Sequence, residues 1–447
     1  MFSKKHIQET IILAAPVAFS QLGHITVGVA DTLMAGQISK DALAASTVAL
    51  SVFFPLFMMY VGFSIGFTPL IAQAHGENDN SKIVRIFKHA VWLNLFVGAV
   101  LTIVLLFGIY LIPFLHQPKH IIDEAEGFFS IIAVSVFPIV IFQIMKQFIE
   151  GLGQTKQAMV VSILGNVINI ILIVILVYGW FGLPEMGLNG IAYATLIARC
   201  AMALTMVLYF FSDSQYTIYR KLYNTTKLNW KDFKMVFYKS YPVALQMTFE
   251  SGAFSTAALF IGTFGTAQLA AHQIALNLAS ITYMVATGIA AAATVRVGYE
   301  YGRRDKQELK KAGNTAVLIV LVFMGFTALT FALCRSYLPS FYTDDHEVIG
   351  IASILLFMVA FFQLSDGIQV VSMGALRGMG DVVIPSSIAF TAYWIIGLPL
   401  GCLLAFTFGL EVYGIWIGLT SGLVFASVIL LIRFIVKSRK LVFDVDL

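Results

Sequence analysis

Residues 241–265 read YPVALQMTFESGAFSTAALFIGTFG, and this stretch decides how the rest of the chain is interpreted. It is long enough to cross a bilayer as a helix, since about 20 apolar residues suffice, yet Glu250 lies near its middle. A charged side chain at the centre of such a helix costs about 2.5 to 3.5 kcal/mol, so it normally faces a cavity or a partner. Glu250 is therefore a candidate functional residue of a membrane protein.

The same stretch belongs to an internal repeat. Residues 242–302 align without gaps with residues 16–76, and both segments begin with Pro-Val-Ala and end with Gly. A second pair of similar segments is EGLGQ at residues 150–154 and RGMGD at residues 377–381, each after an apolar run. Such sequences are typical of tight connections that need glycine. The repeat predicts a duplicated membrane bundle.

The composition is that of a membrane protein. Of the 447 residues, 59% are hydrophobic and 12% are charged, against roughly 45 to 50% and 25% in soluble domains. We therefore expect a polytopic protein in a lipid bilayer, without an appended soluble domain. The net charge of +4 does not indicate nucleic acid as a partner, because the basic residues lie between the apolar runs.

Two further features of the sequence concern processing and redox state. The N-terminal segment resembles a signal peptide, but its apolar run continues past Asp31, so we expect an uncleaved first span. The three cysteines have no metal-type spacing, and we expect free thiols at Cys200, Cys334 and Cys402.

The apolar runs predict an all-α protein with twelve transmembrane helices in two parallel-repeat lobes of six. The predicted domains are an N-lobe at 1–211, a polar cytoplasmic linker at 212–235 and a C-lobe at 236–447. The expected spans are 8–36, 43–74, 88–113, 126–149, 157–179, 188–211, 236–263, 269–299, 312–338, 348–375, 382–408 and 411–435. An even number of spans starts both halves on the same face of the membrane.

The distribution of Lys and Arg predicts the orientation. With the N-terminus inside, only Lys40, Lys119 and Arg335 of the 28 basic residues fall in outer loops. Arg199 lies within the sixth span, where it either pairs with an acid or extends to the interface. Because cytoplasmic segments carry an excess of Lys and Arg, both termini are predicted to be cytoplasmic.

This topology buries three acids: Asp31, Glu250 and Asp366. Polar side chains recur at helical spacing around them and on other spans, which predicts a shared, hydrated interior. The candidate lining residues are Gln21, His24, Asn166, Asn169, Gln246, Gln273, Asn277 and Gln363. The alternative for each is a hydrogen bond between helices, the commoner role for Gln, Asn and a packing histidine.

Buried carboxylates suit the binding of cations. They coordinate Na⁺ through oxygen, take up H⁺ or attract organic cations. The helical rise puts Glu250 and Asp366 deep enough in their spans to share one site. A site that holds either a coupling ion or a cationic substrate is the core of an antiporter. We expect no cofactor other than this Na⁺ or H⁺.

The residues quoted resemble those of the multidrug and toxic compound extrusion (MATE) transporters, in particular the NorM-like branch. The resemblance rests on PVAFSQLGHITVGVADTLMAGQIS, AAHQIALNLAS, the helix of Glu250 and DGIQVVSMGALRGMGD. It implies two six-helix lobes in a V shape, open alternately to each side, which export bulky, often cationic drugs or dyes against Na⁺ or H⁺. It also implies that Glu250 and Asp366 are C-lobe cation-site acids and that Asp31 is the N-lobe acid. Members with a second N-lobe acid on the fifth span differ here, where Asn166 and Asn169 stand.

Two other readings compete with a monomeric transporter in the cell membrane. The G-x-G-D of residues 378–381 fits intramembrane aspartyl proteases, but the repeat copy has Gln154 in place of Asp381, as expected of a turn. A flippase for lipid-linked saccharides should line its cavity with cations to hold pyrophosphate. The topology predicts that the buried charges are mostly acids, which favours cationic cargo and a protein that is not an enzyme.

Overall fold

The structure is a computed structural model that describes residues 4–115 and 118–443, apart from the side chains of residues 114 and 115. Within these ranges the chain is almost entirely helical and has no strand, which confirms the all-α class. Eleven of the described helical segments are long and apolar enough to cross a membrane. The remaining expected span, α10 (Trp230–Gly262), is 33 residues long, but polar residues such as Gln246 and Glu250 lower its hydropathy.

The first six expected spans form eight helices, because two of them are broken. The helices are α1 (Lys4–Ile38), α2 (Lys40–Ile65), α3 (Thr68–Gly76), α4 (Asn80–Gly108), α5 (Lys119–Val134), α6 (Val136–Gly151), α7 (Thr155–Tyr178) and α8 (Gly187–Ser212). The breaks fall at Gly66 and at Ser135, in each case three residues before a proline. Pro69 and Pro138 have no N–H for the carbonyl four residues earlier, so the helical hydrogen bonding stops there.

The second six expected spans start with α10 and continue with α11 (Thr266–Gly302), α12 (Lys306–Leu333), α13 (His346–Gly378), α14 (Val383–Phe390), α15 (Leu398–Cys402) and α16 (Glu411–Lys440). The expected span 382–408 is not a regular α-helix. It contains π-helical segments at Thr391–Gly397 and Leu403–Thr407. Such bulges widen a helix locally and often occur at functional sites.

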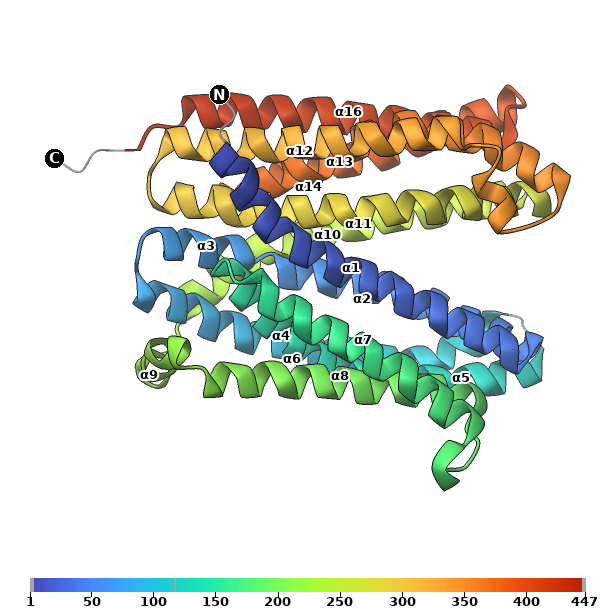
Figure 1. Ribbon diagram of the computed structural model, residues 1–447, viewed down its shortest axis with the longest axis horizontal. Coiled ribbons are helices and arrows are strands. Elements are labelled where there is room, and N and C mark those ends of the chain that lie inside the picture. Colours follow the sequence, from blue (N-terminus) through green and yellow to red (C-terminus); the bar gives the residue numbers. More distant parts are fainter. Residues whose placement is uncertain (1–3, 116–117, 444–447) are drawn as a thin grey trace. The chain divides into compact units, whose positions relative to one another are not determined.

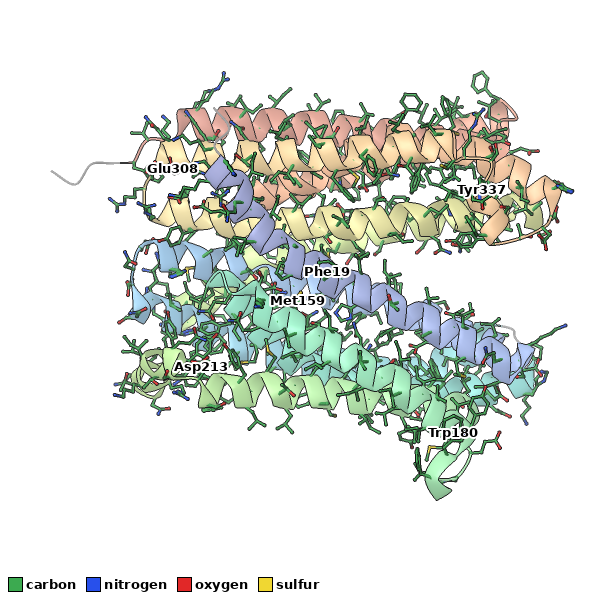
Figure 2. All side chains as sticks on the ribbon, viewed as in Figure 1. Phe19, Met159, Trp180, Asp213, Glu308 and Tyr337 are labelled. Atoms are coloured by element: carbon green, nitrogen blue, oxygen red, sulfur yellow. The ribbon has the colours of Figure 1, made fainter. Side chains whose placement is uncertain are left out.

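The polar connection between the halves is structured. A 3₁₀ turn at Ser214–Tyr216 leads into the short helix α9 (Thr217–Thr225), and α10 begins at Trp230. Asp213, labelled in Figure 2, starts this segment and accepts a hydrogen bond from the amide of Gln215 at 3.0 Å. Because Tyr216 is buried against the rings of Phe148 and Phe210, the connection packs onto the helices that precede it.

Contacts between residues divide the chain into two compact units. The C unit contains the residues up to Ala18, Ala72–Glu77 and all residues from Leu245, and the N unit contains Phe19–Ile71 and Asn78–Ala244. In the C unit α11, α12, α13 and α16 run side by side, and in the N unit α4, α6, α7 and α8 do so (Figure 1). The predicted lobes at 1–211 and 236–447 remain a prediction.

The two glycine-rich helix ends have the same backbone, as their sequences predict. Gly153 and Gly380 both adopt positive φ, at 80° and 72°. The amide of Gln154 bonds to the carbonyl of Ile149 at 3.1 Å, and that of Asp381 bonds to Leu376 at 2.9 Å. Both helices therefore end in a Schellman motif, whose C′ residue is preferably glycine.

Candidate cation site

Glu250 lies on α10 and is held by two amide groups. Gln246, one turn earlier, donates from Nε2 to Oε1 of Glu250 at 3.2 Å. Gln369 of α13 donates from Nε2 to the same oxygen at 2.9 Å. Both hydrogen bonds end on Oε1 and leave Oε2 unused. No salt bridge with a described residue neutralises the carboxylate. Glu250 is thus oriented by neutral donors while one oxygen remains available to a ligand.

Asp366 of α13 is 8% exposed and accepts no hydrogen bond from any described residue. It lies within electrostatic range of Glu250, as do the phenols of Tyr283 and Tyr393. Asp366 is buried and Glu250 half-buried, and two such carboxylates that repel each other favour the uptake of a cation between them. The structure therefore brings together the two acids that we expected to share a site.

Tyr393 extends the network. Its hydroxyl donates to Oε1 of Gln369 at 3.1 Å, so that the amide of this glutamine is fixed with its Nε2 toward Glu250. Tyr393 belongs to the π-helical segment Thr391–Gly397. The π-helical segment thus positions the Tyr393 hydroxyl, which fixes the orientation of Gln369 as a hydrogen-bond donor to Glu250.

Arg377, like Gln369 and Tyr393, is not among the site residues predicted from the sequence. It is the penultimate residue of α13 and lies beyond the expected span 348–375, but it is only 6% exposed. Its Nη2 donates to Oε1 of Gln246 at 3.2 Å. The guanidinium therefore acts on Glu250 through the intervening amide of Gln246.

The other polar residues expected in the C unit have different environments. Gln363 is buried, accepts a hydrogen bond from Thr327 at 2.6 Å, and its Nε2 has no partner among the described residues. Gln273 and Asn277 are exposed on α11 and form no hydrogen bond with the described residues. Their assignment as cavity-lining residues remains a prediction.

In the N unit, Asp31 is half-buried near the end of α1. Its Oδ1 is inaccessible and has no hydrogen-bond partner among the described residues. Arg199 of α8 interacts electrostatically with Asp31 and donates to Ser135 at 2.7 Å. The guanidinium also lies over the rings of Phe53 and Phe57, 5.7 and 5.5 Å from their centroids. Arg199 therefore offsets the charge of an acid instead of extending to the interface.

The expected lining residues of the N unit are partly assembled. Asn166 and Asn169 of α7 are buried, and Asn169 donates to Thr195 at 3.2 Å. Gln21 and His24 of α1 are half-buried and make no hydrogen bond with the described residues. A Cβ on Gly23 would lie 2.4 Å from Nδ2 of Asn166, so this glycine lets α1 approach α7 closely.

The prediction that only three acids are buried is wrong. Glu150 of α6 is 5% exposed and lies 3.9 Å from Nζ of the buried Lys146. The buried basic residues Lys146, Arg296 and Arg377 stand against the buried acids Glu150, Asp232, Asp366 and Asp381, so the expected excess of acids is small. The sequence did not indicate that Lys146 and Glu150 are buried, because both lie close to a helix end, where the predicted topology puts charges at the membrane–water interface.

Comparison with known proteins identifies the family. The MatE family matches residues 16–175 and 242–403, which is more than half of the chain and one copy for each half of the repeat. The chain belongs to this family. MATE proteins are transporters, and the chain is accordingly a multi-pass membrane transporter and not an enzyme. The resemblance predicted from the sequence motifs is confirmed.

Individual relatives and a solved structure are consistent with this family. The chain is 33% identical over 436 residues to "Probable multidrug resistance protein NorM" of Idiomarina loihiensis, with 96% of this chain and 94% of the relative covered. It is also 33% identical over 434 residues to "Multidrug resistance protein MdtK" of Photorhabdus laumondii, with 96% and 95% covered. A crystal structure of a MATE protein in the straight conformation matches with a TM-score of 0.90 at 19% identity, covering 98% of this chain and 99% of that one. The last match confirms the fold.

Proposed function

We propose that this MATE transporter is a cation-coupled antiporter that exports bulky, mostly cationic organic compounds, including drugs and dyes. The observation that carries the proposal is the pair of half-buried Glu250 and buried Asp366, which lie in one helical unit with no salt bridge to either acid among the described residues. The names of the relatives, multidrug resistance proteins, support the cargo class.

In the proposed mechanism the coupling ion and the cationic cargo compete for the negative charge of Glu250 and Asp366. An external Na⁺ or H⁺ binds at Glu250 and Asp366 and favours release of the cationic cargo to the outside. The cation then leaves on the inner side as the transporter returns by alternating access. A cation that binds one conformation better than the other shifts the equilibrium by that difference in affinity. Asp31 contributes to the cargo or proton site of the N unit in this proposal.

The location and assembly belong to the same proposal. The transporter works in the cell membrane with both termini in the cytoplasm, because the excess of Lys and Arg lies in the segments on that side. It acts as a monomer, since one chain supplies both halves of the repeat. Export of antibiotics by such a protein would confer resistance.

The test is efflux of a fluorescent organic cation from liposomes that contain the purified protein. A Na⁺ gradient and a pH gradient are imposed separately, with Glu250→Gln measured alongside. Export under one gradient that disappears in the variant supports the antiporter and identifies its ion. No export under either gradient contradicts the proposal, and a lipid-linked sugar would then be assayed for the flippase.

A further inference from the structure

We propose that Arg377 sets the charge of the cation site, so that a single monovalent cation neutralises it. The inference rests on the proposed function and concerns how many charges the site accepts. Two ionised carboxylates, Glu250 and Asp366, and one guanidinium leave a net charge of −1. Without Arg377 the same site would carry −2, which suits two monovalent cations or one divalent cation.

The position of Arg377 fits this role. A guanidinium stays charged in proteins, and this one is 6% exposed. No salt bridge joins it to an acid in the described part of the chain, and its buried Nε has no hydrogen-bond partner there. Its charge is therefore not consumed by a carboxylate of its own and remains to act on the site.

The contact with Glu250 is indirect, and this is what leaves the acid free to bind. Arg377 donates to the carbonyl oxygen of Gln246, and the amide nitrogen of Gln246 donates to Oε1 of Glu250. Hydrogen bonds in such a chain polarise one another in a low-dielectric interior. A direct ion pair would occupy the carboxylate, whereas the relay lowers the negative potential and keeps Oε2 available.

The N unit provides an internal control for this assignment. The helix end that corresponds to Arg377-Gly378-Met379-Gly380-Asp381 has Glu150 at the position of Arg377, and the turn has the same hydrogen bonds. The backbone of the turn therefore does not require a basic residue. The reason for an arginine lies in what its side chain faces, namely Gln246 and, beyond it, Glu250.

The experiment compares Arg377→Gln with the charge-conserving Arg377→Lys in the full-length protein in liposomes. The readouts are the concentration of driving cation at half-maximal export, the maximal rate, and direct binding of ²²Na⁺ and Ca²⁺ to purified protein. Arg377→Gln should lower the half-maximal concentration about tenfold, which is the effect of one unit charge roughly 12 Å from the bound cation at an effective dielectric constant near 20. It should also gain Ca²⁺ binding, while Arg377→Lys stays near the wild type.

A structural role predicts the opposite sign. If Arg377 merely held the helices together, Arg377→Gln would weaken cation binding or leave it unchanged, and either result overturns the inference. Equal behaviour of Arg377→Lys and Arg377→Gln also overturns it. If the wild type shows no gradient-driven export, the proposed function fails, whereas the binding measurements still decide the charge of the site.

A second variant covers the case in which Arg377→Gln does not fold. Gln369→Glu adds a carboxylate beside Glu250 and reaches a net charge of −2 while Arg377 remains. It should likewise gain Ca²⁺ binding relative to the wild type. A folded Gln369→Glu protein that binds no Ca²⁺ contradicts the proposal that the net charge of the site decides which cation it binds.

Discussion

Two helix ends in this chain share their backbone and differ in their buried charge. The end of α6 and the end of α13 both close with a Schellman turn at a glycine of positive φ. In the N unit the buried residue at this end is Glu150, which pairs with Lys146 on its own helix at 3.9 Å. In the C unit it is Arg377, which contacts a different helix through Gln246.

The difference indicates how one duplicated scaffold acquired two roles. In the N unit the charges near the helix end are matched within one helix, and Arg199 offsets Asp31. In the C unit two carboxylates stand against one guanidinium, and a net negative charge is left. The same contrast holds on the first helix of each repeat, where His24 occupies the position equivalent to Glu250. The C unit is therefore the one in which we propose the cation site.

The largest effect should come from neutralising Glu250. Glu250→Gln removes a unit charge from the coordination of the cation, worth about 4 kcal/mol at 4 Å and an effective dielectric constant of 20. That energy corresponds to about a thousandfold in affinity, so gradient-driven export should fall to the background leak. Asp366→Asn should behave in the same way. The measurement is efflux from liposomes, with insertion checked by the amount of folded protein.

The matched control is His24→Gln, at the equivalent position of the other repeat. It should retain most of the export, because His24 makes no hydrogen bond with a described residue and adds no fixed charge to the cation site. Comparable losses in both variants would mean that the two units do not differ as we infer. Export that persists in both Glu250→Gln and Asp366→Asn would make these acids structural.

The second effect concerns stability. Glu150→Gln leaves Lys146 buried without its carboxylate, and breaking a buried pair in this way should lower the free energy of unfolding by about 3 kcal/mol. Thermal unfolding in detergent measures the loss. The half-maximal concentration of the driving cation should not change, in contrast to Arg377→Gln. A tenfold shift in that concentration would place Glu150 in the cation pathway as well.

Much of the fold could be predicted from the sequence because it depends on local chemistry. Apolar length predicted the spans, and the glycines of EGLGQ and RGMGD predicted the tight turns. The breaks at Gly66 and Ser135 were missed, although Pro69 and Pro138 carry the signal in the lost N–H. Glu250 and Asp366 could be picked out because a carboxylate in the middle of an apolar run is costly wherever it points, whereas Glu150 at a helix end could not.

Arg377 and Lys146 could not be placed in this way. Both stand near the end of a helix, where a long basic side chain normally reaches the interface. Side chains on a helix point back toward its N-terminus, which from these positions is toward the interior of the span. Arg377 turns inward toward Gln246 on another helix, and the spacing along one helix does not encode that partner. Lys146 has its partner Glu150 on its own helix, but the sequence does not show that this pair is buried.

The third effect tests whether the two turns are energetically equivalent. Gly153→Ala and Gly380→Ala each force a residue with a Cβ into positive φ, which costs about 1 to 2 kcal/mol. The two substitutions should lower the free energy of unfolding by similar amounts, because the backbone is the same in both places. Thermal unfolding of the two variants side by side provides the comparison. A much larger loss for one of them would show that its surroundings also depend on the turn.

The smallest effect should come from Asp31. Its Oδ1 accepts no hydrogen bond from a described residue and its charge is offset by Arg199, so Asp31→Asn should change turnover or substrate range about fivefold or less, equivalent to roughly 1 kcal/mol. Export rates of several chemically different compounds under one gradient measure this change. The half-maximal concentration of the driving cation should stay near the wild-type value, since Glu250 and Asp366 are intact. A loss of cation affinity as large as that of Glu250→Gln would move the coupling site into the N unit, whereas unchanged transport of every compound would remove Asp31 from the cargo site.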